Sequence, residues 1–281
     1  MAHDSEDLVL VDFPAEGVRR LTLNRPAKRN ALSNPLRARL FELLEAGDLD
    51  PAVRVTILRG AGPCFSAGYD LSGGTGEPFP FHTAPGAGHW ARHVVEGAFR
   101  IWDLAKPVIA QVHGWCLAGG SELATSCDLV YVAEDAKIGY PPVRNMSPPD
   151  NQFHAWMCGL RGAMEMMLTG NAIDGNEAVR LGFANRAYPA DQLDEAVVAM
   201  ALQVAQVPSE VQAMNKRSVH RAMEIMGLRA AIRAGTEIQA LALTTQTSRD
   251  AFAAVKSGLT GALSARDAAF GDYRTKEGGG D

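Results

Sequence analysis

The sequence has few cysteines and no long apolar run, and both shortages limit what the protein can be. The four cysteines are scattered among apolar neighbours, and none forms a CxxC motif or a close cluster with histidine. This spacing predicts neither zinc nor disulfides and favours reduced thiols in the core of a cytoplasmic protein. No apolar run approaches the ~20 residues that cross a membrane, and the polar residues 1–7 do not resemble a signal peptide.

Positive charge is also scarce. The chain has 27 Lys and Arg against 32 Asp and Glu, which gives a net charge of −5. Without a long basic run the sequence does not support a nucleic-acid interface, and an anionic ligand needs a local basic patch instead. With 281 residues, 47% of them hydrophobic, the chain suits one large globular unit or a core with a smaller appendage.

Residues 106–128 combine a strand, a glycine turn and an acidic helix start. Val108 to Val112 is a short, β-branched apolar run that predicts a buried strand; residues 113–118 then turn the chain, and Gly119-Gly120 opens a helix. The first N–H groups of a helix are unpaired, so an anionic oxygen is stabilised there. Glu122 can lie on the same side of this turn, which offers an oxyanion donor beside an acid/base group. A tight turn with a glutamate that only complements the helix dipole is the alternative.

A second glycine-rich segment, residues 59–71, follows a predicted strand over residues 53–58. Its glycines can bring backbone amides close to a ligand, and a plain loop is the alternative; the Gly-Lys-Ser/Thr ending of a P-loop is missing. The Gly/Pro-rich residues 72–90 predict a long loop, which we interpret as a mobile wall over a pocket. His82, His89 and His93 are interpreted as solvated or pocket-lining side chains, because no carboxylate is spaced with them as a metal ligand.

The rest of the pattern predicts an αβ core followed by helices. Alternation over residues 8–13 and 18–23 predicts a β-hairpin, and residues 129–133 predict a buried strand. Helices are predicted from Pro35, over residues 91–104 and 152–168, from an Asp174 cap to residue 181, and from an Asp191 cap to residue 207. Residues 208–270 are helical in pattern, with no β-rich run.

Four segments resemble the crotonase superfamily, the enoyl-CoA hydratase/isomerase family. They are residues 24–32 (NRPAKRNAL), 65–71 (FSAGYDL), 106–141 (KPVIAQVHGWCLAGGSELATSCDLVYVAEDAKIGYP) and 168–189 (LTGNAIDGNEAVRLGFANRAYP). The resemblance implies an α/β fold with a crotonase-like spiral core of ββα units over residues 1–206. It also implies a C-terminal helical oligomerisation region over residues 207–281, in a homotrimer or homohexamer.

The resemblance also implies an acyl-CoA thioester ligand, whose carbonyl lies between the backbone N–H groups of Tyr69 and Gly119. Lys28 and Arg29 would lie towards the CoA phosphates, with a solvated loop as the alternative. Ser66, Ala67 and Asp70 would line the nucleotide side or brace the loop. Further implied contacts to substrate or CoA come from Ala31, Gly68, Leu71, Gly120 and Tyr140.

The acid/base residues depart from the family pattern. Hydratases of this family activate a water with two glutamates; the first matches Glu122, and the second falls at Pro142, which has no acid/base group. This departure puts efficient hydration of simple enoyl-CoAs in doubt. Asp150 is the candidate catalytic replacement, although a helix cap at this position is the favoured interpretation because capping needs no special pocket.

We therefore expect a cytoplasmic enzyme of acyl-CoA metabolism, closest to an enoyl-CoA hydratase and thus a hydro-lyase. The alternatives are another crotonase reaction (a thioester or C–C bond hydrolase, an aromatic acyl-CoA lyase or an isomerase) and a catalytically weak acyl-CoA-binding subunit. No metal or redox cofactor is implied, and coenzyme A enters only as part of the substrate.

Overall fold

The computed structural model describes residues 8–72 and 77–271. Its main sheet has the strand order β1-β2-β3-β4-β6-β8. β1 (Val9–Ala15) and β2 (Val18–Leu23) pair antiparallel, with Gly17 in a left-handed conformation at the turn, so the predicted hairpin is confirmed. The other strands pair in parallel: β3 (Val55–Gly60), β4 (Val108–Val112), β6 (Leu129–Ala133) and β8 (Arg186–Tyr188).

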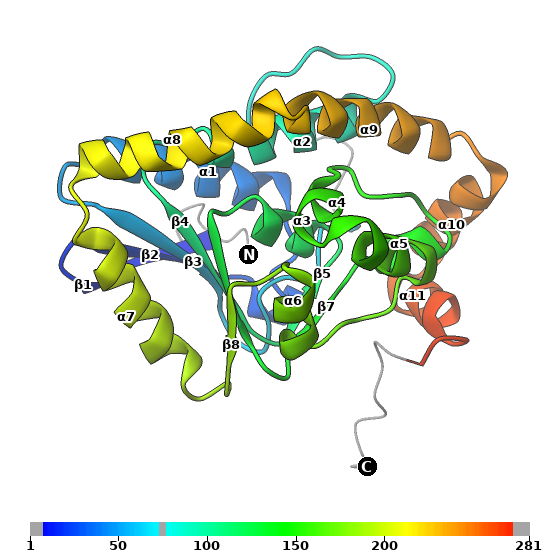
Figure 1. The fold of residues 1–281 in the computed structure, drawn as a ribbon. Helices are drawn as coiled ribbons and strands as arrows, with labels where there is room; N and C mark the ends of the chain where they lie inside the picture. The colour runs from blue at the N-terminus through cyan, green and yellow to red at the C-terminus, as the bar shows by residue number, and fades with distance from the viewer. Residues whose placement is uncertain (1–7, 73–76, 272–281) are drawn as a thin grey trace.

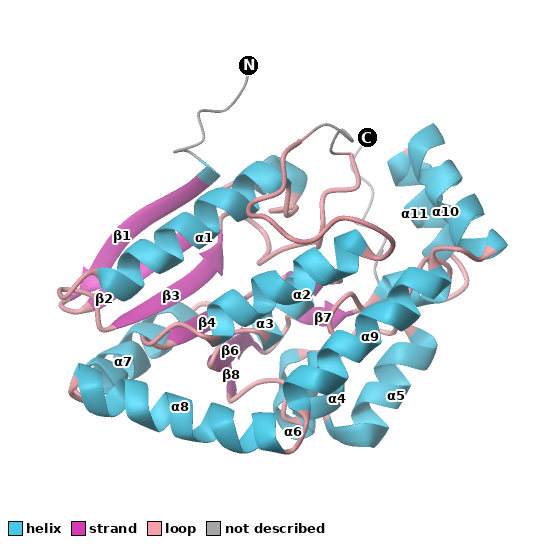
Figure 2. Cartoon of the chain, turned by 90° about the horizontal axis from the view of Figure 1, so that it is seen from above, coloured by secondary structure: helices cyan, strands magenta, loops and turns pink. Residues whose placement is uncertain are grey.

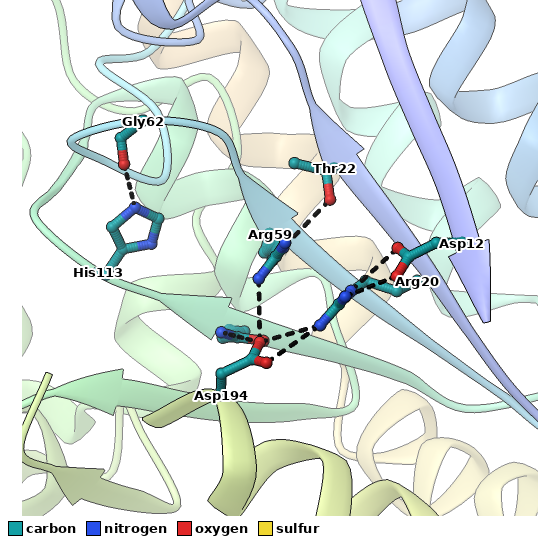
Figure 3. A network of polar contacts seen from close by, with 8 residues as sticks. Asp12, Arg20, Thr22, Arg59, Gly62, His113 and Asp194 are labelled. Atoms are coloured by element: carbon teal, nitrogen blue, oxygen red, sulfur yellow. Dashed lines mark hydrogen bonds and ion pairs between the residues drawn. The ribbon is translucent and has the colours of Figure 1, made fainter. Parts of the chain in front are cut away.

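Helices cover both faces of this sheet, and two neighbouring arginines of β2 show how. Successive side chains of a strand point to opposite faces. Arg19 donates to the Leu43 carbonyl of α1 (Asn34–Leu49), whereas Arg20 reaches Asp194 of α7 (Leu193–Ala205) (Figure 3). The strands between these two layers are apolar because they are buried on both sides; all five residues of β4 are buried.

A small second sheet positions the glycine turn of the central stretch. β5 (Trp115–Leu117) pairs in parallel with β7 (Lys137–Gly139), and α3 (Gly119–Thr125) follows β5 after one residue. The prediction of a plain turn over residues 113–118 is therefore wrong in part. Three-residue strands exist because of their tertiary partners and carry too short a pattern to be recognised in the sequence.

Two further helix predictions need correction. The single helix predicted over residues 152–168 is two helices, α4 (Phe153–Met157) and α5 (Gly159–Thr169), because Gly159 adopts a left-handed conformation between them. Asp191 does not cap α7, whose N-cap is Gln192. Asp174 does cap α6 (Gly175–Leu181), accepting from the Glu177 N–H at 2.8 Å.

The C-terminal part consists of α8 (Ser209–Ile225), α9 (Leu228–Ala242), α10 (Gln246–Ser257) and α11 (Leu259–Asp267). α8 and α9 run along one side of the molecule, and α10 and α11 lie at one end (Figure 1). α9 packs on α2 (His89–Trp102), which lies between α1 and α9 (Figure 2). A buried ion pair between Arg144 and Asp267, 2.9 Å long, ties the end of α11 to the core. The predicted fold class is confirmed; the boundary after residue 206 and the oligomerising role of the last helices stay predictions.

Candidate active site

The two glycine-rich segments pack directly against each other. The Ser66 N–H donates to the Trp115 carbonyl and the Leu117 N–H donates to the Ser66 carbonyl, both at 3.0 Å. A Cβ on Gly120 would lie 2.5 Å from the Ser66 carbonyl oxygen, so only glycine allows this approach. The tertiary structure thus places the start of α3 beside residues 66–69.

The same contact brings together the two predicted oxyanion donors. A Cβ on Gly68 would lie 3.1 Å from the Gly119 nitrogen, and one on Gly119 would lie 2.5 Å from Cε2 of the Tyr69 ring. Among the residues described, the N–H groups of Tyr69 and Gly119 have no hydrogen-bond acceptor. Ala118, which precedes α3, is held at a φ of 49°, a strained conformation for a residue with a side chain. The arrangement can hold a carbonyl oxygen that acquires negative charge.

Glu122 lies fully buried one turn further along α3. Its Oε2 accepts from the Tyr69 hydroxyl at 2.8 Å, and its Oε1 accepts from the Asn151 N–H at 3.1 Å. Burial raises the pKa of Glu122 to about 7, even though the donors around it, first the Asn151 N–H and then the phenols of Tyr69 and Tyr140, favour the charged form. A carboxyl group with this pKa can take or give a proton at neutral pH.

Asp150 faces the same region and does not cap a helix. α4 begins only at Phe153, its N-cap is Gln152, and no side chain caps it, so the favoured helix-cap interpretation of Asp150 is wrong. The Asp150 carboxyl is buried, and its Oδ1 has no partner within the described part of the chain. Burial, and next the charge of Glu122, raise the pKa of Asp150 well above its ordinary value. The structure therefore brings two carboxyl groups together that both hold protons tightly.

One buried cation faces this acidic pair. Arg37 of α1 lies with its guanidinium 5.6 Å from the centre of the Tyr69 ring and 5.4 Å from that of Trp90. Its charge lowers the pKa of Asp150, although less than burial and Glu122 raise it. Arg37 was not predicted as a site residue, because an arginine within an amphipathic helix is typical of a solvated side chain.

A pocket of about 430 Å³ lies in front of these groups. Its walls are largely apolar and come from the two glycine-rich segments, the residues after β7, and the helices α9 to α11. The residues that line it are Arg29, Ala67, Tyr69, Asp70, Leu71, Trp90, Trp115, Leu117, Ala118, Tyr140, Pro141, Pro142, Met146, Ser147, Asp150, Gln239, Leu243, Phe252, Leu263, Arg266 and Asp267. Pro142 is among them, so the position where the family places its second glutamate does reach the pocket wall. The lining by the C-terminal helices was not predicted, because nothing in their helical pattern indicates what they pack against.

Other predicted contact residues lie behind the pocket wall. Ser66 is fully buried and donates to the Asn30 carbonyl at 2.8 Å, and the Gly68 carbonyl accepts from the Leu32 N–H. These bonds brace the loop.

Asp70 both lines the pocket and pairs with Arg25 at 2.8 Å. Four further predicted residues, Lys28, Ala31, Gly119 and Gly120, are not among the lining residues. Their contacts with substrate stay predictions.

The histidines near the long loop pack with aromatic rings. The Thr83 hydroxyl contacts ring nitrogens of both His89 and His93, and Phe79 lies 4.6 Å from each ring centre. In the ranges that the structure covers, no group of three or more His, Cys, Asp or Glu side chains is arranged to hold a metal ion.

The predicted mobile wall over residues 72–90 includes residues 73–76, which lie outside the described residues. Its last residue, Trp90, lines the pocket.

Comparison with known proteins gives consistent results. The sequence model of the enoyl-CoA hydratase/isomerase family matches residues 14–272. The chain is 32% identical over 217 residues to a hydroxycinnamoyl-CoA hydratase-lyase from Pseudomonas fluorescens, covering 75% of this chain and 77% of that protein. It is 32% identical over 209 residues to a mitochondrial enoyl-CoA hydratase from Pongo abelii, covering 73% and 69%. The crystal structure of an enoyl-CoA hydratase from Mycobacterium smegmatis has a TM-score of 0.86 at 28% identity, covering 98% of this chain and 99% of that one.

Proposed function

Because the chain belongs to the enoyl-CoA hydratase/isomerase family, as its sequence resemblance indicated, we propose that it is a hydro-lyase that adds water to a 2-enoyl-CoA. The observation that carries this proposal is the position of Glu122, a buried carboxyl with a pKa of about 7 on the helix that also presents the Gly119 N–H. An acid/base group and an oxyanion donor on one helical turn suit proton transfer at the carbon chain of a thioester.

The oxyanion donors act on the thioester carbonyl. Its oxygen accepts hydrogen bonds from the N–H groups of Tyr69 and Gly119, which are fixed before the substrate arrives. Addition of water to the double bond moves negative charge onto this oxygen and forms an enolate. Losing one such donor typically costs about 10²–10³ in rate, so the pair accounts for a large part of the catalysis.

The two carboxyl groups divide the proton transfers. Glu122, with a pKa of about 7, is ionised in a large fraction of molecules near neutral pH and serves as the base for the water. Asp150 has its pKa raised well above the ordinary value, stays protonated, and delivers a proton to the α-carbon. Neighbouring carboxyls with different environments commonly take opposite roles. Asp150 thereby takes over from the glutamate that Pro142 replaces.

The mouth and walls of the pocket suit an acyl-CoA. The Arg29 side chain is exposed and stacks on the Trp115 ring at 4.3 Å, which leaves its charge available for the CoA phosphates, with Lys28 beside it in sequence. The apolar lining inside, including Met146, Leu243 and Phe252, suits the acyl group.

A second candidate is a different reaction of the same family, such as isomerisation, C–C bond hydrolysis or cleavage of an aromatic acyl-CoA. Pro142 in place of the second glutamate favours it. So does the Tyr69–Glu122 hydrogen bond, because the phenol occupies a site on Glu122 where a water would otherwise bind. A weakly catalytic acyl-CoA-binding subunit is the third candidate.

We further propose a homotrimer or homohexamer in the cytoplasm that acts in fatty-acid metabolism. Large apolar side chains are exposed on α8 and α9, among them Met214, Ile225 and Leu241, and an interface between subunits would bury them. In the described residues no helix is both long and apolar enough to span a membrane. Mass photometry of the purified chain tests the subunit number, with a monomer as the contradicting result.

The function is tested by mass-resolved turnover of crotonyl-CoA, a long-chain 2-enoyl-CoA, an aromatic enoyl-CoA and a saturated acyl-CoA. A gain of one water on an enoyl thioester, abolished in Glu122→Gln and retained in the exposed control Glu134→Gln, supports the hydro-lyase. Free CoA or a cleaved acyl chain supports the second candidate. Binding without any product supports the third.

A further inference from the structure

The side chain of Tyr69 separates Glu122 from the pocket. Glu122 has no exposed surface and is not among the pocket-lining residues, whereas Tyr69 lines the pocket and donates its hydroxyl to Glu122 Oε2 at 2.8 Å. A molecule in the pocket therefore meets the phenol first. Direct contact with the carboxylate requires the phenol to leave this hydrogen bond.

Packing on several sides holds the phenol in place. The ring lies against Gly119, where a Cβ would come within 2.5 Å of it. Trp90 meets it edge to face at 5.1 Å between ring centres, and the Arg37 guanidinium lies 5.6 Å from its centre. A side chain fixed by its neighbours in this way is preorganised for one function of its hydroxyl.

We propose that Tyr69 is a catalytic residue in addition to its backbone role: its phenol takes the proton from the attacking water, and Glu122 acts through it. This inference rests on the acid/base role proposed for Glu122. In the forward step an O–H bond of the water breaks, and the phenol oxygen accepts that proton while the phenol O–H proton passes to Glu122 Oε2. The electron pair left on the water oxygen forms the new C–O bond at the β-carbon, and the electrons of the double bond move onto the thioester oxygen. The reverse step returns both protons.

Tyr140 provides a matched comparison. It also lines the pocket and its phenol also lowers the pKa of Glu122, but less than the phenol of Tyr69 does. Its ring instead packs edge to face on His154, with 6.0 Å between the ring centres. Tyr140→Phe therefore changes the electrostatic surroundings of Glu122 but leaves the 2.8 Å hydrogen bond from Tyr69 intact. Comparing the two phenylalanine variants separates the effect of proton transfer through Tyr69 from the effect of altered electrostatics.

Several charged or titratable groups surround Glu122 and influence its pKa. They are Arg37 from α1, Tyr69, Tyr140, and Asp150 before α4. His154 of α4 bonds Ser121 on α3, and burial lowers its pKa to about 4, which leaves it neutral at pH 7. Loss of the Tyr69 hydroxyl removes a donor to the charged form of Glu122 and therefore raises the pKa of Glu122.

The test compares hydration of crotonyl-CoA by wild type, Tyr69→Phe and Tyr140→Phe. We expect Tyr69→Phe to lower kcat for hydration at least ~10²-fold with KM changed less than threefold, and to move the acidic limb of the pH profile upward. Tyr140→Phe removes the hydroxyl of a residue that also lines the pocket, so it should lose activity too, but at least tenfold less than Tyr69→Phe. No hydration by wild type refutes the hydro-lyase together with the relay, whereas hydration that survives in Tyr69→Phe refutes the relay alone.

Several results overturn the relay. They are no hydration by wild type, hydration within threefold of wild type in folded Tyr69→Phe, equal losses in the two phenylalanine variants, or faster turnover once the hydroxyl is gone. The last result would show that the phenol blocks Glu122. If Tyr69→Phe does not fold, as judged by circular dichroism, 3-fluorotyrosine at position 69 replaces it. A relay then predicts a hydration rate that changes with the lower pKa of the fluorinated phenol, and an unchanged rate contradicts it.

Discussion

Asp194 of α7 and Glu122 of α3 are two carboxyl groups of the same α/β core, and they differ in the donors that reach them. Asp194, at the start of α7, accepts hydrogen bonds from Arg20, Arg59 and Gln111, each at 3.0 Å (Figure 3). Burial alone would raise its pKa, but the Gln111 hydrogen bond and the two arginine charges together lower it below the ordinary value. This carboxylate joins α7 to β2, β3 and β4.

Within the described residues no arginine or lysine forms a hydrogen bond with Glu122, which instead accepts from the Asn151 N–H and the Tyr69 phenol. Burial therefore raises the pKa of Glu122, because these donors only partly offset the loss of solvation. A carboxylate that accepts hydrogen bonds directly from two arginines stays charged and ties the helix to the sheet. Buried carboxyl groups without a direct hydrogen bond from a cation have raised pKa values and suit proton transfer.

The sharpest way to test this difference is to neutralise Glu122. Glu122→Gln keeps the size of the side chain and removes its ability to transfer a proton, so we expect kcat to fall by about 10³. Steady-state kinetics on the substrate identified by the turnover panel provides the measurement. Glu134→Gln serves as the control, because Glu134 is exposed and does not line the pocket. Retention of more than a tenth of the activity in Glu122→Gln would contradict the role of this carboxyl.

Asp150→Asn tests the second member of the pair. We expect kcat to fall by about 10², because the amide cannot deliver a proton to the α-carbon. Because Asp150 is protonated in this mechanism, its replacement by a neutral amide removes no charge beside Glu122, so the acidic limb of the pH profile should stay in place. A lower rate with an unmoved pH limb would assign Asp150 to proton delivery alone. An unchanged rate would remove it from the mechanism.

The two clusters should also respond to pH with opposite signs. The pKa of folded Glu122, about 7, lies above the unfolded value, so its contribution to stability is full below pH ~4.5 and is lost as pH rises to about 7. The pKa of folded Asp194 is lowered, so its contribution is present above the unfolded value of about 4 and is lost as pH falls through the folded pKa. Scanning calorimetry from pH 5 to 8 should show that Tm decreases less in Glu122→Gln than in wild type. Parallel curves would count against the raised pKa.

The smallest expected effect comes from Asp194→Asn. Half of this side chain is exposed, so we expect the free energy of unfolding to fall by only about 0.5–1 kcal/mol, with kcat unchanged. Urea denaturation and the kinetic assay measure the two quantities on one preparation. A tenfold loss of kcat at unchanged stability would mean that the ion-pair network of Asp194 affects the active site, so that Asp194 is not purely structural.

The sequence was informative where local pattern and local chemistry agree. The hairpin, the buried strand over residues 108–112 and the helix opened by Gly119-Gly120 are all present as predicted. Three-residue strands, the break at Gly159 and the start of α4 were not predicted, because they depend on tertiary partners. The misjudged Asp150 follows from that last error: a cap was expected where the helix had not yet begun.

By itself, the sequence determined the class of fold and the chemical types at the site. Two glycine-rich segments and Glu122 were recognisable because close backbone approach needs glycine and proton transfer needs an acid/base group. Only the tertiary structure decided which groups meet. It placed Arg37 behind Tyr69, turned Asp150 into the pocket, and put the Tyr69 phenol between Glu122 and the substrate space. Burial and the sum of neighbouring charges set these pKa values and contacts, and both arise only when distant segments pack together.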